Sequence, residues 1–281
     1  MLLLVDLDGV VYRGSAPIPG MAELLSRRAA AGDDVVYVTN NSMWYRADYV
    51  ARLAGMGAPV SADRVISSPR ATALYLREVD PGLERVLALG GPGLGRELAD
   101  VGFSVVMAGA AADRVTRLGE DRFEASGRPG AVVVGLDPEL TWERLAVASS
   151  SIRAGARFVA TNRDPVYPTE SGLMPGAGAI VAAVEAASGV VPVSIGKPAP
   201  LLLEEAAKAV GVDPREAVMI GDGIRTDLLA AQAVGARCVL MLTGVATRAE
   251  VEALAGAAAP TAIAADAAEL ELVLAGLRRS A

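Results

Sequence analysis

The sequence of 281 residues contains no histidine and only one cysteine. The absence of histidine excludes a Ser-His-Asp triad, a Cys-His pair, acid–base catalysis by imidazole and zinc held by imidazole nitrogens. The single cysteine, Cys238, cannot form an intramolecular disulfide, which fits a reducing cytoplasm, and the apolar run over residues 236–242 predicts a packed core thiol. Any reaction must therefore use carboxylates, lysine, hydroxyls, amides or a metal bound by oxygen.

Basic residues and long apolar runs are also scarce. The chain carries 26 Lys and Arg against 33 Asp and Glu, a net charge of -7, whereas nucleic-acid binding depends on clustered basic residues. The apolar run at residues 1–5 is shorter than the roughly 7–15 residues of a signal-peptide core. No segment reaches about 18 apolar residues without a charge. We therefore expect a cytoplasmic protein with neither a nucleic-acid partner nor a membrane partner.

Aromatic residues are few: three Phe, two Trp and six Tyr, although 52% of the residues are hydrophobic. The core must then consist mainly of Ala, Val and Leu, which suits buried parallel strands flanked by Ala-rich helices. Short strands alternate with helices along the whole chain, which predicts right-handed βαβ units. The predicted fold class is α/β, with a Rossmann-like doubly wound parallel sheet.

The predicted elements form two sets. In the first set we expect strands at residues 2–7, 35–38, 193–195, 217–220 and 237–242. The expected helices of this set cover residues 20–31, the stretch from after residue 42 to about 57, residues 200–210 and a stretch after residue 226. In the second we expect strands at 85–89, 104–106, 131–134 and 157–160, and helices at 93–100 and 142–154. Turn signals at 80–82 and 189–192 separate the sets. We therefore predict a discontinuous core, residues 1–80 and 191–281, with an inserted α/β domain at 81–190.

Four polar segments follow predicted strands of the first set. They are Asp6-Leu7-Asp8-Gly9, Thr39-Asn40-Asn41, Gly196-Lys197-Pro198 and Gly221-Asp222 through Asp227. Because the carboxyl ends of parallel strands share one edge of a sheet, we expect these segments to meet in one crevice. Each segment alone has an ordinary reading as a turn, a helix cap or a solvated loop. Their shared edge makes them a candidate site.

A crevice with four carboxylates needs positive charge. One pair of unit charges about 4 Å apart costs roughly 4 kcal/mol at an effective dielectric near 20. Lys197 supplies one positive charge, and oxygen ligands without histidine favour Mg²⁺ over zinc or copper for the rest. Phosphate fits such a site, because its oxygens can bind the metal and accept hydrogen bonds from Lys197 and Thr39.

A carboxylate is the natural nucleophile when histidine and reactive thiols are absent. Asp6, at the strand end, is the better-placed candidate and would form an acyl-phosphate that water then cleaves. Asp8 could protonate the leaving oxygen and later deprotonate the water. Gly9 permits the tight turn that this arrangement needs.

The four segments together resemble the motifs of the haloacid dehalogenase-like hydrolases. They are most similar to subclass IIA, in which a large C2-type cap domain is inserted between the second and third motifs. This class includes para-nitrophenyl phosphatases, pyridoxal phosphatases, phosphoglycolate phosphatases and glycerol-phosphate phosphatases. The resemblance covers almost the whole chain, and no motif position departs from the family pattern.

The resemblance implies a role for each motif residue. It makes Asp6 the nucleophile and a Mg²⁺ ligand, and Asp8 the acid–base, bound to the metal through its backbone carbonyl. The remaining implied roles are phosphoryl binding by Thr39, Asn40 and Asn41, charge neutralisation by Lys197, and completion and orientation of the metal site by Asp222 and Asp227. Asp8 favours phosphoryl transfer, since the dehalogenases of the family lack this second aspartate.

The cap should select the substrate. The segment 161–168, followed by Gly172 and by residues 175–178, is similar to the cap segment that these phosphatases direct at the substrate. Asp164 and Tyr167 could either contact substrate or pack within the cap, and the sequence leaves both readings open. The resemblance also implies a homodimer formed through the cap.

A glycine-rich segment, Gly91-Pro92-Gly93-Leu94-Gly95, follows a predicted strand. Its spacing does not match the G-x-G-x-x-G fingerprint of dinucleotide-binding proteins. A turn between a strand and a helix is the favoured reading.

The predicted function is a Mg²⁺-dependent phosphatase that acts on a small phosphorylated metabolite and hydrolyses para-nitrophenyl phosphate in vitro. Candidate substrates are glycerol phosphate, phosphoglycolate, pyridoxal phosphate, nucleoside monophosphates and sugar phosphates. A non-enzymatic receiver-like phosphate sensor is an alternative, since receiver domains also gather acids, a hydroxyl and a lysine at a sheet edge. A phosphomutase is a weaker alternative, because that activity usually accompanies a smaller cap after the first motif.

Overall fold

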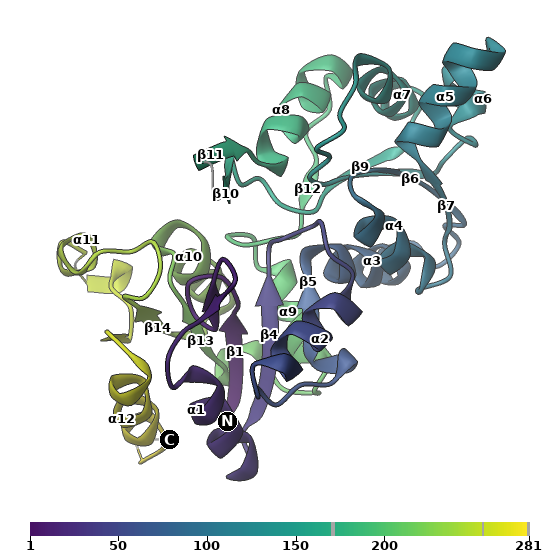
Figure 1. The fold of residues 1–281 in the computed structure, drawn as a ribbon. Coiled ribbons are helices and arrows are strands. Elements are labelled where there is room, and N and C mark those ends of the chain that lie inside the picture. Colours follow the sequence, from purple (N-terminus) through teal and green to yellow (C-terminus); the bar gives the residue numbers. More distant parts are fainter. Residues whose placement is uncertain (170–171, 255, 280–281) are drawn as a thin grey trace. The chain divides into compact units, whose positions relative to one another are not determined.

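The computed structural model describes residues 1–169, 172–254 and 256–279. The chain forms two compact units, shown as a ribbon in Figure 1. The first unit comprises residues 1–39, 47–66 and 197–281, and the second comprises 40–46 and 67–196. The chain therefore passes between the units four times.

The first unit is built on a six-stranded sheet with the order β15-β14-β13-β1-β4-β5. Neighbouring strands from β15 to β4 are parallel. The strands are β1 (Leu2–Asp6), β4 (Asp34–Thr39), β5 (Val65–Ser67), β13 (Val218–Gly221), β14 (Arg237–Met241) and β15 (Ala262–Ala264). All five residues of β1 are buried, as expected for a central strand covered on both faces. The strand order changes direction beside β1, which places Asp6 at the switch point of a doubly wound sheet.

Helices and short turns complete the first unit. α1 and α9 pack against β4, α10 packs against β14, and α12 packs against β15. The elements are β2 (Tyr12–Arg13), β3 (Ala16–Pro17), α1 (Met21–Ala30), α2 (Arg46–Gly55), α9 (Leu201–Lys208), α10 (Leu229–Val234), α11 (Arg248–Glu252) and α12 (Ala267–Arg279). Short 3₁₀ turns cover 62–64, 214–216 and 256–258, and one wide π-type turn covers Ile224–Leu228.

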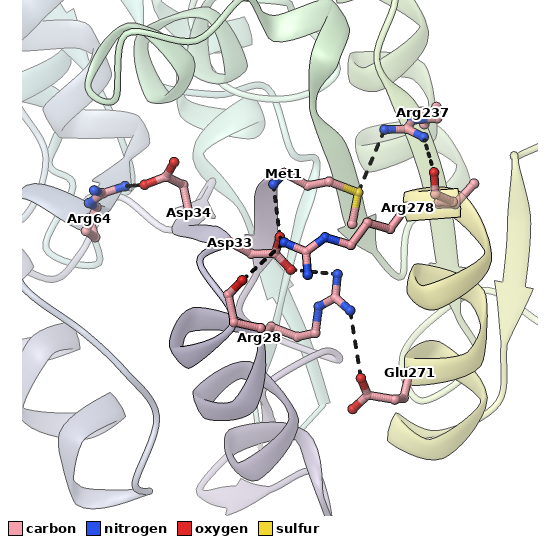
Figure 2. A network of polar contacts seen from close by, with 10 residues as sticks. Met1, Arg28, Asp33, Asp34, Arg64, Arg237, Glu271 and Arg278 are labelled. Carbon is pink, nitrogen blue, oxygen red and sulfur yellow. Dashed lines mark hydrogen bonds and ion pairs between the residues drawn. The ribbon is translucent and has the colours of Figure 1, made fainter. Parts of the chain in front are cut away.

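A buried polar network lies just before the amino end of β4, at the opposite end of this strand from Thr39 (Figure 2). Asp33 is 6% exposed and pairs with the guanidinium groups of Arg28, at 2.6 Å, and Arg278, at 3.2 Å. It also accepts a hydrogen bond of 2.9 Å from the amino group of Met1. Since Arg28 lies in α1 and Arg278 in α12, this carboxylate ties the two helices together.

The second unit contains a parallel five-stranded sheet with the order β12-β9-β8-β6-β7. Its strands are β6 (Arg85–Leu89), β7 (Ser104–Met107), β8 (Ala131–Val134), β9 (Arg157–Ala160) and β12 (Val193–Ser194), with a separate hairpin of β10 (Val166–Thr169) and β11 (Gly172–Pro175). Its helices are α3 (Ser68–Val79), α4 (Pro92–Ala99), α5 (Ala108–Leu118), α6 (Arg122–Ala125), α7 (Trp142–Arg153) and α8 (Ala177–Ser188). The core is mainly aliphatic, as the composition predicts, and its buried aromatics among the described residues include Phe103 and Phe158.

The structure confirms the predicted fold class, a doubly wound parallel sheet and a second α/β sheet. The predicted strands fall within one or two residues of the observed ones, and Cys238 is buried on β14 as predicted. One assignment is wrong: the strand predicted at 193–195 was placed in the first sheet, but β12 pairs with β9 of the second. Residues 67–80 and 191–196 also cluster with the second unit, because α3 packs on α4 and β12 extends the second sheet. In the described part of the chain, helices long and apolar enough to span a membrane are absent.

Candidate active site

Three acidic residues converge at the carboxyl ends of β1 and β13. Asp6, Asp222 and Asp227 are all buried, and one carboxylate oxygen from each lies within 4.8 Å of the others. Lys197, which begins the last segment of the first unit, reaches into this group. Its Nζ donates to Asp6 Oδ1 at 2.7 Å and to Asp227 Oδ1 at 2.6 Å. The predicted convergence of these four residues is therefore present in the structure.

Asp227 has both carboxylate oxygens engaged by the protein. Oδ1 binds Lys197, and Oδ2 accepts hydrogen bonds from the backbone N–H groups of Asp222 and Gly223, at 3.2 and 2.9 Å, and from Thr226 Oγ1 at 3.2 Å. The wide turn Ile224–Leu228 holds Asp227 in this position. Because its oxygens are already bonded, Asp227 is better suited to orient the loop after β13 than to bind a metal directly.

Asp222 lies in a pocket built from glycine backbone. Its Oδ2 accepts a hydrogen bond of 2.8 Å from the N–H of Val245. A Cβ atom at Gly244 would lie 1.7 Å from this oxygen, and one at Gly9 would lie 2.2 Å from it. Gly9 also has a φ of 81°, which L-residues rarely adopt, so both sterics and conformation require glycine. Thr243 Oγ1 closes the arrangement by donating to the Gly9 carbonyl at 2.6 Å.

Burial governs the protonation of this group. Burial raises the pKa of Asp6 well above its ordinary value, despite the opposing charge of Lys197. Burial, together with the charge of Asp227, raises the pKa of Asp222 to about 6. Burial would lower the pKa of Lys197, but the carboxylates of Asp227 and Asp6 outweigh it and the pKa is raised. Lys197 is therefore an ammonium ion held by its partners.

The charge balance of the group fits a bound cation. Three carboxylates face one ammonium ion, so a full set of ionised acids leaves an excess of negative charge in a buried place. A hard divalent cation with oxygen ligands would remove this excess, and Asp6 and Asp222 offer the carboxylates for it. The donor set therefore fits Mg²⁺.

Asp8 is not one of the three buried acids. Its side chain is exposed, and it follows β1 at the start of the turn that leads to β2. Nearby residues still shield the carboxyl from part of the solvent, and this partial burial raises the pKa of Asp8. The N–H of Gly14 and the charge of Arg52 act in the opposite direction. Arg52 of α2 places its guanidinium 3.5 Å from the centre of the Tyr12 ring and donates to the Gly14 carbonyl. Arg52 thus holds the β2–β3 turn, whose Gly14 backbone binds Asp8.

The polar loop after β4 is divided between the units. Thr39 ends β4 in the first unit and is buried, whereas residues 40–46 cluster with the second unit. The Asn40 carbonyl accepts hydrogen bonds of 2.7 Å from both Asn162 Nδ2 and Ser68 Oγ. Asn41 Oδ1 accepts from the N–H of Met43 at 2.9 Å, so Asn41 forms a local turn. The structure thus places Asn40 and Asn41 in a different compact unit from Asp6.

The two predicted specificity residues have different surroundings. Asp164 Oδ2 accepts a hydrogen bond of 3.0 Å from Asn40 Nδ2. Tyr167 is half-buried on β10, pairs with Met174 and packs against the core of the second unit. Tyr167 therefore has at least the packing role. Residues 170–171, which lie between the two parts of the predicted cap segment, are outside the described residues.

Several residues of the site were not found from the sequence. Thr243, Gly244 and Val245 follow β14 at the same sheet edge as Asp6, so the rule used for the other segments could have identified them. Arg52 gave no signal, and Asn162 lies in the predicted cap segment without a role of its own, because the roles of both depend on contacts between segments distant in sequence.

Comparisons with known proteins agree with this geometry. Residues 3–104 match the family model described as haloacid dehalogenase-like hydrolase, and residues 194–270 match a HAD-hydrolase-like model. The acid sugar phosphatase of Staphylococcus saprophyticus is 36% identical over 249 residues, which cover 89% of each chain.

Solved structures are similar over nearly the whole chain. The p-nitrophenyl phosphatase from Archaeoglobus fulgidus has a TM-score of 0.84 and 29% identity, and the match covers 97% of this chain and 98% of that one. The glycerol phosphate phosphatase from Mycobacterium tuberculosis, in complex with magnesium, has a TM-score of 0.82 and 36% identity, with coverage of 96% and 75%.

Proposed function

Because the chain belongs to the haloacid dehalogenase-like hydrolases, we propose that it is a Mg²⁺-dependent phosphatase that hydrolyses small phosphate monoesters through an aspartyl-phosphate. The observation that carries the proposal is the buried group of Asp6, Asp222 and Asp227 around Lys197. Relatives that align over most of the chain are named as phosphatases, which supports this reaction over other hydrolyses. In this proposal the first unit is the catalytic core and the second is the cap.

The metal would be held by the carboxylates of Asp6 and Asp222 and by the backbone carbonyl of Asp8. Asp227 would orient this set through its bonds to the Asp222 and Gly223 N–H groups. Bound Mg²⁺ would withdraw charge from the phosphoryl oxygens and place the phosphorus for attack. The glycine pocket of Gly9 and Gly244 would fix the direction of the Asp222 carboxylate.

The first chemical step is attack by an oxygen of Asp6 on phosphorus. Lys197 holds Oδ1 of Asp6 and its charge favours the ionised carboxylate, so the second oxygen forms the new bond. The bond from phosphorus to the ester oxygen breaks, and the Asp8 carboxyl transfers its proton to the leaving alkoxide. The raised pKa of Asp8 supports this role, because a larger fraction of the carboxyl is then protonated near neutral pH.

The second step regenerates the enzyme. Asp8, now a carboxylate, takes a proton from a water molecule, and the water oxygen attacks the phosphorus of the aspartyl-phosphate. The bond to Asp6 breaks, and inorganic phosphate leaves. Thr39, Asn40 and Asn41 would bind the phosphoryl oxygens in both steps. Lys197 stays an ammonium ion throughout and offsets the negative charge of the transferring group.

The candidate substrates are small phosphate monoesters. Similar proteins are named for acid sugar, p-nitrophenyl and glycerol phosphate phosphatase activities, so sugar phosphates and glycerol phosphates come first in a substrate panel. Phosphoglycolate, pyridoxal phosphate and nucleoside monophosphates complete it. The ranking of kcat/KM across the panel identifies the substrate class.

The receiver-like sensor is less well supported than the phosphatase. A receiver module would account for the first sheet but would not explain the presence of the second unit. The phosphatase relatives align with both units. A phosphomutase has no specific observation in its favour.

Replacement of the nucleophile tests the proposal. Asp6→Asn should abolish hydrolysis of p-nitrophenyl phosphate with Mg²⁺, while circular dichroism shows an unchanged fold. EDTA should abolish wild-type hydrolysis, and added Mg²⁺ should restore it. Substantial turnover by Asp6→Asn would show that another group attacks phosphorus.

A further inference from the structure

Helix α4 presents one face to the segment 40–46, called here the phosphate loop. Gly93 and Glu97 are one helical turn apart on α4 and therefore share a face, which Asp100 at the end of the helix continues. All of these residues belong to the second unit, as does the phosphate loop. Each of the three contacts the backbone or a side chain of the loop residues 43–46.

Gly93 allows the loop backbone to lie directly on the helix. A Cβ atom at this position would lie 2.5 Å from the Met43 carbonyl oxygen and 2.7 Å from the Tyr45 nitrogen. Such distances are impossible for a real side chain, and the atoms concerned are backbone, which cannot rotate away. Any residue other than glycine at position 93 would therefore move the phosphate loop.

Glu97 binds the other end of the loop. It is fully buried, and its Oε1 accepts a hydrogen bond of 2.9 Å from the N–H of Arg46, the first residue of α2. The first N–H groups of a helix have no partner within the helix, so this carboxylate gives the Arg46 N–H a partner from a distant segment of the same unit. The guanidinium of Arg46 lies 3.5 Å from Oε2, and that of Arg70 lies 4.0 Å from it. A buried carboxylate with these partners serves no step of the proposed reaction.

The beginning of the loop is also fixed by the second unit. Asn162 Nδ2 and Ser68 Oγ both donate to the Asn40 carbonyl, and the Leu136 N–H donates to Ser42 Oγ at 2.9 Å. A Cβ atom at Gly135 would lie 3.0 Å from the same hydroxyl, so the backbone approaches closely there too. The loop is therefore held at both ends and in its middle by side chains and backbone of the second unit.

We propose that Gly93 and Glu97 are positioning residues, which set the place of Asn40 and Asn41 by holding the phosphate loop on α4. The inference rests on the proposed function, in which these two asparagines bind the phosphoryl group. It makes the second unit responsible for part of phosphate binding as well as for substrate selection.

A matched pair of substitutions on α4 tests the proposal. Gly93→Ala would press on the loop backbone, whereas at Gly95 an added Cβ would meet only the flexible side chain of Met107, at 2.6 Å. In Gly93→Ala we expect the KM for p-nitrophenyl phosphate and the inhibition constant of inorganic phosphate to rise about tenfold or more, because misplacement by about 1 Å can cost 10²-fold. Gly95→Ala should stay within about twofold of wild type. A fall in kcat with unchanged KM and unchanged phosphate inhibition would indicate lost structure only and would overturn the proposal.

Trp44 gives a readout that does not require activity. It is one of two tryptophans, the other being the 81% exposed Trp142. In a Trp142→Phe background, the emission spectrum therefore reports the phosphate loop alone. Gly93→Ala should shift this spectrum, and Gly95→Ala should not. Identical spectra in the two variants would contradict the proposal.

Glu97 provides an independent test if Gly93→Ala fails to fold. Glu97→Gln keeps an acceptor for the Arg46 N–H, and Glu97→Leu removes it. We expect the glutamine variant to retain near-wild-type phosphate inhibition and the leucine variant to weaken it about tenfold. Equal phosphate inhibition in both would refute the positioning role. If the wild type hydrolyses no phosphate ester, the proposed function fails, and calorimetric binding of inorganic phosphate to the same variants still decides the inference.

Discussion

Removal of the buried ammonium ion should destabilise the first unit strongly. The Lys197 side chain is 3% exposed, and it pairs with Asp6 at 2.7 Å and with Asp227 at 2.6 Å. Lys197→Met leaves both carboxylates buried without this partner. Breaking a buried ion pair costs about 3–5 kcal/mol. In EDTA at pH 8 we therefore expect the free energy of unfolding to fall by this amount.

The loss should shrink in acid because one carboxylate can then take up a proton. In the unfolded chain the aspartate carboxyl has its ordinary pKa of 3.8. Relative to that state, each pH unit above 3.8 adds about 1.4 kcal/mol to the cost of folding with this carboxyl protonated. This cost is about 6 kcal/mol at pH 8, so the repulsion persists there, and about 1.6 kcal/mol at pH 5. At pH 5 the penalty of Lys197→Met should therefore fall to about 2 kcal/mol.

Denaturant titrations followed by far-ultraviolet circular dichroism measure both values. The exposed pair Arg248–Glu252 provides the control, since its side chains are 54% and 60% exposed and Arg248→Met should cost less than about 1 kcal/mol. A Lys197→Met penalty as small as the control at pH 8, or one independent of pH, would refute the idea of an ionised buried pair.

Three further predictions concern the metal, the polar network and the hairpin. Without metal, the unfolding temperature should rise as the pH falls from about 7 towards 4, because the folded pKa of Asp222, about 6, lies above the ordinary value of 3.8 and the folded state binds the extra proton. Added Mg²⁺ at pH 7 should raise the unfolding temperature, and Asp222→Asn should flatten both responses in differential scanning fluorimetry. Arg28→Met should lower the free energy of unfolding, measured by denaturant titration, by about 3 kcal/mol, since it removes a buried partner of Asp33. A negligible change would show that Arg278 alone is a sufficient partner for this carboxylate. Tyr167→Ala should cost about 1–3 kcal/mol of stability through lost packing, and a reordering of kcat/KM across the substrate panel would show that the ring also contacts substrate.

Much of the first unit could be predicted because its signals are local. The buried strand before Asp6 and the strand before Gly221 are apolar runs with polar residues at their carboxyl ends, and parallel topology brings such ends together. The proximity of Lys197 to Asp6, 191 residues away, is confirmed, but its stated reason is wrong, because the strand before Lys197 belongs to the second sheet. The strand pattern therefore identified four of the six strands of the first sheet, all but β5 and β15, and the edge that carries the site.

The remaining features depend on pairing between segments, which periodicity does not encode. The two-residue strand β12 has no pattern that distinguishes one sheet from the other, so its pairing with β9 could not be predicted. In the sequence Glu97 is an ordinary helical glutamate, and only the structure shows that it accepts a hydrogen bond from the Arg46 N–H. The glycines at 93 and 244 likewise become necessary only through the atoms that lie against them.

The burial of Lys197 has a practical consequence for protein chemistry. The sequence contains two lysines, Lys197 and Lys208, and the side chain of Lys208 is 54% exposed. Amine-reactive reagents need an accessible, unprotonated nitrogen, and Lys197 is neither accessible nor easily deprotonated. Among the lysines, a dye or a surface linker should therefore attach at Lys208 alone, without any engineered cysteine.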